Sequence, residues 1–294
     1  MQTVQTKLNI VIVGGSGFIG TYLQQFLRQK GHVVTAFGRE AFSPEFDLTA
    51  QLEGQDVLIM LAGENVGQRW SRAYKKALLE SRTLTNQTLE QALNRCQNPP
   101  KRILSASAIG IYPQNDLQTP LDESCTHVGE GFLGALGQQW EAASLQLIPQ
   151  PVIMRFGVVL GNHGGALKKM LPAFKFGLGG PVAGGTQSFS WIHIEDLARA
   201  VHFLIRHTEL AGVFNMTSPN PISNRDFGQT LAAVLRRPFI LPMPEWILSW
   251  IFGEGAQVLT HSSAVIPQRL MAAGFQFNYP QIKPALTDLL GDSL

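Results

Sequence analysis

The chain begins its first apolar run with Leu8-Asn9-Ile10-Val11-Ile12-Val13 and then turns through Gly14-Gly15-Ser16-Gly17-Phe18-Ile19-Gly20. The apolar run predicts a buried parallel strand, and the residues from Phe18 to Lys30 predict a helix with one apolar face. Glycine lets the backbone turn and approach an anion closely, while the first N–H groups of the helix are free to donate. The segment therefore predicts a cradle for the pyrophosphate of a dinucleotide.

The surroundings of this glycine spacing make the prediction specific. The sequence contains 29 glycines in 294 residues, so the spacing by itself is weak support. Here it follows a strand, opens a helix and precedes a second apolar run, His32-Val33-Val34-Thr35-Ala36-Phe37, which completes a βαβ unit. The alternative is a glycine turn with a purely structural role.

The residues after the second strand indicate which dinucleotide binds. An acidic side chain at this point accepts hydrogen bonds from the ribose hydroxyls of NAD, whereas this chain has Gly38-Arg39. The guanidinium of Arg39 is a planar, permanent cation that suits a 2′-phosphate, so we expect NADP(H). Two alternatives stay open: Arg39 is an ordinary surface arginine, or Glu40 binds a ribose hydroxyl instead.

The composition is typical of an enzyme with one large domain or two interlocked domains. The hydrophobic fraction is 45%, the charged fraction is 15% and the net charge is +2. A charge this small gives no electrostatic case for nucleic acid or an anionic membrane, so we expect neither as a partner. The longest apolar stretch, Phe239 to Phe252, is too short and too often interrupted by proline to span a bilayer.

Two further observations predict the location of the protein. No signal peptide is visible, because the first residues are polar and lead directly into a strand. Cys96 and Cys125 are the only cysteines, lack the spacing of a metal site and favour a reducing compartment. We therefore expect a cytoplasmic protein without a metal site.

Strands and helices alternate through the first half of the chain. Apolar runs predict strands over Asp56–Gly63, Arg102–Ala108 and Val152–Leu160. Helical periodicity predicts helices over Ser71–Asn94 and Gln138–Leu147. This order predicts an α/β fold, a Rossmann-type doubly wound parallel sheet.

The character of the sequence changes after Gly161, where glycine clusters and prolines divide shorter elements. We expect a dinucleotide-binding domain over residues 1–160. A smaller, partly interleaved substrate lobe follows over residues 161–294, with some elements returning to the sheet. Asp196 is expected to begin a helix from Leu197 to Leu204.

Several motifs occur in one order along the chain: Gly14–Gly20, Leu61-Ala62-Gly63-Glu64-Asn65, Arg69-Trp70, Ser81-Arg82, Ser105-Ala106-Ser107-Ala108-Ile109-Gly110-Ile111-Tyr112, Trp140-Glu141, Arg155–Gly161 and Ser190–Ile194. Together they resemble the atypical short-chain dehydrogenase/reductases of the "epimerase family protein" group, which are similar to NAD-dependent epimerases and dehydratases. A C-terminal segment around Ala273-Gly274-Phe275-Gln276-Phe277 is also typical of the group. The resemblance implies binding of NADP(H), whereas the substrate of the group is unassigned.

The resemblance also identifies a missing catalytic pair. Short-chain reductases usually transfer a proton with a Tyr-x-x-x-Lys pair, in which the lysine lowers the pKa of the tyrosine. Counting back from Glu141 places Leu133 and Gly137 at these positions. Neither side chain performs acid–base chemistry, so we expect any proton transfer to use another group.

Three residues near the expected ligand-binding edge of the sheet carry groups that suit catalysis. Ser107 offers a hydroxyl to a substrate carbonyl, and Tyr112 is the phenol best able to replace the missing proton donor. Glu64 acts as a base or orients a ribose. Each has a structural alternative: Ser107 bonds nearby backbone, Tyr112 packs in the core, and Glu64 caps a turn.

The residues that we expect to bind the cofactor are Gly14, Gly15, Ser16, Gly17, Phe18, Ile19, Gly20, Arg39, Leu61, Ala62, Gly63 and Arg82. Arg82 is included because the resemblance implies that it reaches the cofactor; the alternative is a solvated helix arginine. Arg155 lies in an apolar run and therefore needs a buried carboxylate or an anionic ligand as its partner. We expect His193 to be a core residue and not a catalytic one. We expect Lys168 or Lys169 either to bind an anionic substrate or to belong to a lid without direct contacts.

These observations favour an oxidoreductase-like or epimerase-like enzyme that binds NADP(H) and acts on an unidentified carbonyl or hydroxyl substrate. The alternative is a non-catalytic NADP(H) sensor or interaction protein that kept the cradle without the catalytic pair.

Overall fold

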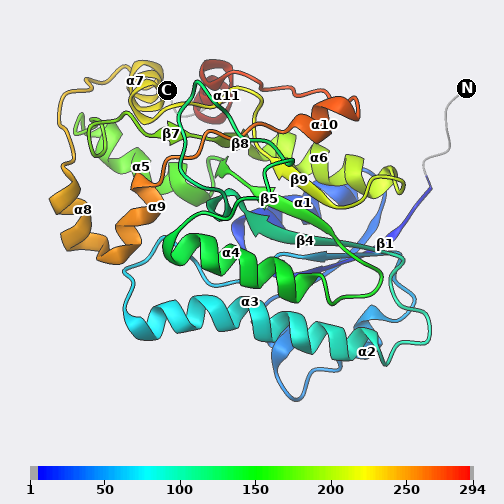
Figure 1. The fold of residues 1–294 in the computed structure, drawn as a ribbon. Coiled ribbons are helices and arrows are strands. Elements are labelled where there is room, and N and C mark those ends of the chain that lie inside the picture. The colour runs from blue at the N-terminus through cyan, green and yellow to red at the C-terminus, as the bar shows by residue number, and fades with distance from the viewer. Residues whose placement is uncertain (1–5, 292–294) are drawn as a thin grey trace, which may run out of the picture.

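The computed structural model describes residues 6–291, apart from the side chains at positions 251 and 252. A six-stranded parallel sheet forms its centre, in the order β2 (Val33–Phe37), β1 (Asn9–Val13), β3 (Val57–Met60), β4 (Arg102–Ala108), β5 (Val152–Phe156) and β9 (Val213–Met216). Figure 1 shows helices on both faces: α1 (Phe18–Gln29) and α6 (Ile194–Arg206) lie on one, and α3 (Arg72–Leu93) and α4 (Gly131–Ser144) lie on the other. The predicted Rossmann-type doubly wound sheet is therefore confirmed.

The first strand is buried on both of its faces. Ile10 and Ile12 pack in the core cluster that includes residues of α1 and α6, whereas Val11 and Val13 pack in the cluster that includes residues of α3. All four side chains have no exposed surface. A central strand that helices cover on both faces is apolar at every position. This continuous apolar run is the sequence feature that predicts the strand.

The strand order places a switch point beside β1. The chain leaves β1 through α1 and returns to pair β2 on one side, while β3 pairs on the other side of β1. At such a point the loops that follow neighbouring strands run in opposite directions and leave a crevice at the carboxyl edge of the sheet. The loops after Val13 and Met60 border this crevice.

The expected strand over Val152–Leu160 is divided between two sheets. β5 ends at Phe156, and β6 (Val158–Leu160) pairs in parallel with β8 (Trp191–His193) in a separate two-stranded sheet. A Cβ at Gly157 would lie 2.8 Å from the carbonyl oxygen of Ser190, so the chain changes sheets where only glycine fits. A third sheet pairs β7 (Ser188–Phe189) with β10 (Ile222–Ser223).

The remaining helices are α2 (Leu48–Leu52), α5 (Gly165–Lys175), α7 (Asn224–Val234), α8 (Glu245–Phe252), α9 (Gln257–Thr260), α10 (Gln268–Ala272) and α11 (Ile282–Leu290). Short 3₁₀ turns span Arg39–Phe42, Ile109–Ile111 and Glu254–Ala256. Figure 1 shows α5, α8 and α9 together at the left of the molecule, with the connection from α7 to α8 along the left edge.

Elements that follow residue 160 complete the main sheet. β9 pairs with β5, and α6 packs over the same face as α1. Arg102 at the start of β4 donates to the carbonyl oxygens of Leu204 and Leu210 at 2.8 and 2.7 Å. The guanidinium therefore fixes the C-terminal end of α6 against the sheet, where free carbonyl groups attract a cation.

The helix α4 differs most in its boundaries from the sequence prediction. α4 begins at Gly131, seven residues before the expected Gln138, because packing outweighs the low helix propensity of its glycines. A Cβ at Gly137 would lie 2.8 Å from the Cβ of Ile111, so this glycine permits the close approach of α4 to the segment after β4.

The expected role of Asp196 as a helix-start residue is wrong. His193 is the N-cap of α6, and its Nδ1 accepts a hydrogen bond from the N–H of Glu195 at 3.1 Å. Asp196 lies inside the helix, is fully buried, and accepts hydrogen bonds from the N–H groups of Asn278 and Tyr279 at 2.8 Å each. Its carboxylate therefore fixes the C-terminal segment to α6.

Within residues 6–291, none of the helices combines the length and the apolar character that crossing a bilayer requires.

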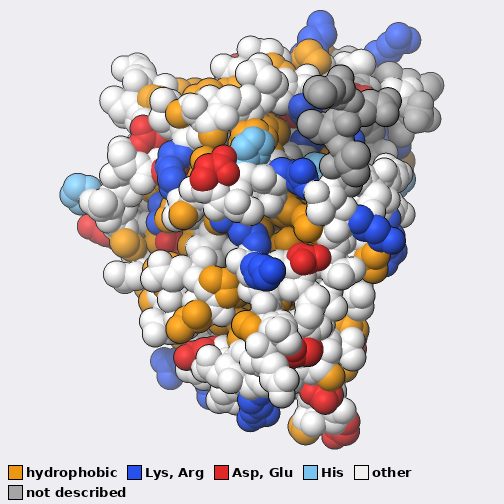
Figure 2. Space-filling view, turned by 90° about the vertical axis from the view of Figure 1, so that its right-hand side faces the viewer, with side chains coloured by type: hydrophobic (Ala, Val, Ile, Leu, Met, Phe, Trp, Pro, Cys, Tyr) orange, Lys and Arg blue, Asp and Glu red, His pale blue; other side chains and the backbone are white. Residues whose placement is uncertain are grey.

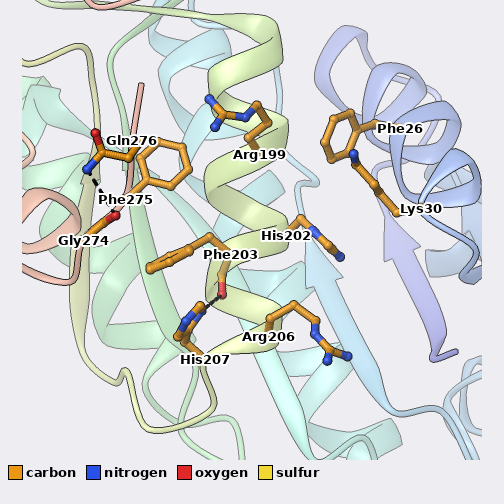
Figure 3. Close-up of a pocket in the computed structure, with 10 residues that line it drawn as sticks. All are labelled: Phe26, Lys30, Arg199, His202, Phe203, Arg206, His207, Gly274, Phe275 and Gln276. Atoms are coloured by element: carbon orange, nitrogen blue, oxygen red, sulfur yellow. Dashed lines mark hydrogen bonds between the residues drawn. The ribbon is translucent and has the colours of Figure 1, made fainter. Parts of the chain in front are cut away.

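A cavity of about 400 Å³ lies between the C-terminal ends of α1 and α6 (Figure 3). Lys30, Arg199, His202 and Arg206 line it, and Phe26 forms part of its wall. The basic groups at the ends of both helices complement the negative ends of their dipoles. Figure 2 shows that basic, acidic and hydrophobic side chains are mixed on the right-hand face of the molecule.

Two histidines connect α6 to the start of β2. His32 Nδ1 accepts a hydrogen bond from the N–H of Leu8 at 3.2 Å, so the neutral ring carries its proton on Nε2. That Nε2 lies 3.0 Å from Nε2 of His202, which must accept. Burial, the neighbouring His32 and the nearby cations Lys30 and Arg206 lower the pKa of His202 to about 4.

This contact predicts acid sensitivity. The pKa of His202 is lower in the folded protein than its ordinary value of about 6.5, so its contribution is complete above pH 6.5 and is lost as the pH falls towards 4. Between pH 7 and pH 5 we expect the free energy of unfolding to fall by about 1 kcal/mol through this group, less than the full shift would give because water screens the partly exposed ring. Urea titrations at both pH values measure the change, and His202→Gln should remove most of it. An unchanged pH dependence in His202→Gln would contradict the assignment.

Candidate cofactor and catalytic site

The loop after β1 needs glycine because three backbone segments meet there. A Cβ at Gly14 would lie 2.6 Å from the backbone nitrogen of Ala62, and Gly14 has a φ of 90° that favours glycine. A Cβ at Gly20 would lie 2.6 Å from the carbonyl oxygen of Gly14. The N–H groups of Gly14 and Gly15 both donate to the carbonyl of Phe37 at 2.8 Å. These contacts hold the loop against β2, β3 and its own helix.

Gly17 differs from the other glycines of the loop. It is exposed and precedes α1 as its N-cap, and the only protein atom near a Cβ added there would be the carbonyl oxygen of Gly14, at 3.5 Å. No side chain caps the helix, and among the described residues no acceptor bonds the N–H groups of Phe18 and Ile19. An open position beside free N–H groups at a helix N-terminus fits a pyrophosphate.

Phe18 has two separate roles in this arrangement. Its N–H group faces the open end of α1, whereas its ring fills the space that a Cβ would need at Gly161, Gly164 or Gly165. The ring therefore joins the cradle to the loop that follows β6. Sequence reasoning placed Phe18 in the cofactor site but did not predict this packing.

Arg39 is exposed at the end of β2. Its guanidinium lies 3.0 Å from the Glu64 carboxylate, with 88% of the arginine side chain and 28% of the glutamate side chain exposed. An ion pair this open to water contributes little, so Arg39 is available to a phosphate at small cost. Glu40 accepts a hydrogen bond from the N–H of Gly38 at 2.6 Å, and that bond lowers its pKa.

Arg82 lies beneath the loop that follows β3, and only 6% of its surface is exposed. Its guanidinium donates to the carbonyl oxygens of Leu78 and Glu64 at 2.8 and 3.0 Å and lies over the ring of Trp140. Burial lowers its pKa to about 10, so it remains a cation at neutral pH. In this geometry Arg82 supports the loop from below, and its expected contact with the cofactor stays a prediction.

The loop after β3 runs from the main sheet to α5 and α8. Its first part is fixed by the N–H of Leu61, which donates to the carbonyl of Val13 at 2.8 Å. Further on, Lys169 Nζ of α5 donates to the carbonyl of Gly67 at 3.2 Å, and Arg69 donates to the carbonyl of Trp250 in α8 at 3.0 Å. Lys169 therefore contacts the loop through its amino group while its side chain stays exposed.

Ser107 belongs to a buried polar network. Its hydroxyl donates to Glu141 Oε1 at 2.6 Å, and Arg155 binds both oxygens of the same carboxylate at 2.7 and 2.8 Å. Burial disfavours the charged form of Arg155, but the bonds to Glu141 outweigh it and raise the pKa of the guanidinium. The partner that Arg155 was expected to need is thus a buried carboxylate.

Tyr112 lies in the same network with its side chain fully buried. Its phenol donates to Asn215 Oδ1 at 2.9 Å, and its ring lies beneath the guanidinium of Arg155. Burial raises the pKa of the phenol. Sequence reasoning identified neither Asn215 nor Glu141 as partners, because only the folded sheet brings β9 and α4 to this point.

The positions of the missing pair lie beside this network. Leu133 packs against Gly110: a Cβ added to Gly110 would lie 3.6 Å from the Cβ of Leu133. Gly137 lies so close to Ile111 that a lysine side chain would not fit there. The helix that would carry a Tyr-x-x-x-Lys pair therefore packs directly on the segment after β4. The structure brings Ser107 and Tyr112 together through Arg155 and Glu141, while Glu64 lies at the Arg39 end of the crevice.

The family models match most of the chain. The model described as the NAD dependent epimerase/dehydratase family matches residues 10–217, and a domain of unknown function, DUF1731, matches residues 243–289. The chain is 36% identical to the human epimerase family protein SDR39U1, covering 96% of this chain and 100% of that protein. It is 33% identical to the epimerase family protein YfhF of Bacillus subtilis, covering 97% and 99% of the two chains.

Solved structures are similar over the same length. The crystal structure of the human protein SDR39U1 (isoform 2), solved with NADPH, has a TM-score of 0.89 and 35% identity, and covers 97% of this chain and 100% of that one. A nucleoside-diphosphate sugar epimerase from Corynebacterium glutamicum has a TM-score of 0.78 and 28% identity. That match covers 98% of this chain and 59% of the larger protein.

The glycines of the cradle provide a matched pair of tests. Gly17→Val should fold normally, because its Cβ meets open space, but should lose dinucleotide binding, because the branched side chain occupies the place of the pyrophosphate. Gly20→Ala should instead lower stability by about 1–3 kcal/mol, since its Cβ would collide with backbone. Calorimetric titration and thermal unfolding separate the two effects. A folded Gly17→Val protein with normal affinity would show that the cradle is misplaced.

Proposed function

The chain belongs to the NAD dependent epimerase/dehydratase family, and from that premise we propose that it binds NADP(H) at Gly14–Gly20 and acts as an oxidoreductase on a carbonyl or hydroxyl substrate. The observation that carries the proposal is the open helix N-terminus at Gly17, framed by glycines whose Cβ atoms would collide with backbone. The NADPH in the crystal structure of the 35% identical human relative supports the choice of cofactor.

Preference for NADP(H) over NAD(H) depends on Arg39. Its side chain lies at the end of β2, where the 2′ position of the adenosine ribose binds in a Rossmann crevice, and its exposed pair with Glu64 is easily exchanged for a phosphate. Glu40 is the acidic alternative at this edge, but its carboxylate is engaged by the N–H of Gly38.

We expect NADPH to bind more tightly than NADH, and Arg39→Ala to remove most of the difference. A charge-assisted contact with the 2′-phosphate contributes about 1.5–3 kcal/mol, which is about tenfold to a hundredfold in Kd. Calorimetric titration of both proteins with both cofactors measures this. Equal affinities in the unmodified protein would rule out the NADP(H) assignment.

Proton transfer in the proposed reaction runs through Ser107 and Glu141. Bound NADP(H) supplies or accepts the hydride. In the oxidation direction the substrate hydroxyl gives its proton to Ser107 Oγ while the proton of Ser107 moves to Glu141 Oε1, 2.6 Å away. In reduction the two transfers run in reverse, and the substrate oxygen takes its proton from Ser107 Oγ. The proposal requires the crevice to open above Ser107, which is 1% exposed in this structure.

Tyr112 and Glu64 have less direct positions in this scheme. Tyr112 holds the segment after β4 to Asn215 of β9 and would have to give up that hydrogen bond to reach a substrate. Glu64 positions Arg39. Tyr112 remains the alternative proton donor, because its phenol is part of the same network.

Substitutions along β4 distinguish these roles once a substrate has been found by following NADPH absorbance across a metabolite panel. Ser107→Ala should lower kcat by about 10²-fold or more, since it breaks the path to Glu141. Ser105→Ala is the matched control: this serine is buried two residues earlier and bonds Ser144, so kcat should be unchanged. Tyr112→Phe should also leave kcat nearly unchanged.

The opposite result, a large loss in Tyr112→Phe with normal turnover in Ser107→Ala, would transfer the role of proton donor to Tyr112. Tight NADPH binding without oxidation by any compound of the panel would favour the sensor over the enzyme.

A further inference from the structure

Two segments that follow residue 160 carry an unusual share of the exposed large apolar side chains. Among the described residues, fifteen large hydrophobic side chains are exposed, and seven of them belong to two short segments. These are Phe176, Leu178, Ile240, Leu241, Met243, Trp246 and Trp250, which we call the tryptophan face. Phe176, Trp246 and Trp250 are 81%, 71% and 76% exposed, so the face is not a set of partly covered core residues.

The two segments are joined by backbone hydrogen bonds. The N–H groups of Ile240 and Leu241 donate to the carbonyl of Gly179 at 3.0 and 3.1 Å, and Met243 donates to Pro181 at 2.9 Å. Below them the rings of Phe174 and Phe239 stack. The backbone that carries Phe176 and Ile240 is therefore fixed by hydrogen bonds and by the stacked rings beneath it, while their side chains remain exposed.

α8 begins two residues after Met243 and carries two further exposed tryptophans. Trp246 and Trp250 are one turn apart on one side of the helix, whereas Leu248 between them is fully buried. The other end of the helix is anchored, since the carbonyl of Trp250 accepts from Arg69. Figure 1 shows α8 and the connection that leads to it at the left edge of the molecule.

Basic residues flank the tryptophan face. Residues 175–178 and 236–250 contain Lys175, Arg236 and Arg237, all exposed, against the single acid Glu245. The net charge of the whole chain, +2, gave no reason to expect an anionic partner. A net charge does not describe how charges are distributed, and here three cations lie near exposed aromatic side chains in the sequence. Tryptophan with neighbouring lysine or arginine is the composition that favours the boundary between lipid headgroups and acyl chains.

We propose that the tryptophan face binds peripherally to a membrane surface that contains anionic lipids. A second copy of this chain is a poorer fit, because an isologous contact through this face would bring the positively charged residues of both copies into one interface. The contact lies in the interface and does not span it: the eight residues of α8 extend only about 12 Å, against a hydrocarbon thickness of about 30 Å.

The experiment uses the full chain and vesicles of phosphatidylcholine with or without phosphatidylglycerol. Cosedimentation should show binding to the anionic vesicles that weakens with salt. The double variant Trp246→Ser/Trp250→Ser should lower the partition coefficient by at least about tenfold. Lys175→Gln/Arg237→Gln should lower it on anionic vesicles alone. Ile148→Ser, at a side chain that is 71% exposed outside the face, is the matched control and should bind normally.

Tryptophan fluorescence gives a second readout on the same samples. Trp70, Trp140 and Trp191 are each less than 10% exposed, so a blue shift on vesicle binding reports Trp246 and Trp250. Unchanged fluorescence, or equal binding by the double tryptophan variant and the parent, would overturn the proposal. So would a dimer, seen by analytical ultracentrifugation, that Trp246→Ser/Trp250→Ser dissociates, because a second copy would then cover the face.

Discussion

The close approach of the backbone at Gly14 to the backbone at Ala62 is the constraint on which the cofactor site depends. It brings the loops after β1 and β3 together at the switch point of the sheet, with Gly20 packed against the carbonyl groups of Gly14 and Gly15. Because these contacts are between backbone atoms, the first turn of α1 is fixed in direction and its free N–H groups point into the crevice. Arg39 at the end of β2 and the loop over Arg82 then stand at defined places around that opening.

A buried ionic network lies beside Leu133 and Gly137, the positions at which the sequence predicts the missing pair. α4 packs so closely on the segment after β4 that Gly137 has no room for a long side chain, and Arg155 and Glu141 fill the interior beside it. A buried ion pair is costly to separate, because either partner alone would be an uncompensated charge. The network thus fixes the relation between β4, β5 and α4 in addition to any part that it has in proton transfer.

The parts of this molecule that could be predicted from sequence are those with a local cause. The strand before Gly14, the helix after it and the long helix capped by Ser71 follow from a buried apolar run, a glycine turn and a capping side chain. The need of Arg155 for a partner was also predictable, but its identity was not, because any of 21 acidic residues satisfies the same requirement until the chain has folded. The start of α4 was missed because glycines selected for close packing lower the helix propensity of the same residues.

The return of β9 to the main sheet has a consequence for a chain that is still being synthesised. When residue 160 leaves the ribosome, β5 has no neighbour on its outer side, and the sheet face that α6 will cover still exposes its apolar side chains. The face is covered only when α6 has been synthesised, and the edge of β5 is paired only when β9 at Val213–Met216 has followed. An uncovered apolar face and an open strand edge invite pairing with other chains, so the nascent protein passes through an interval in which chaperone protection matters most.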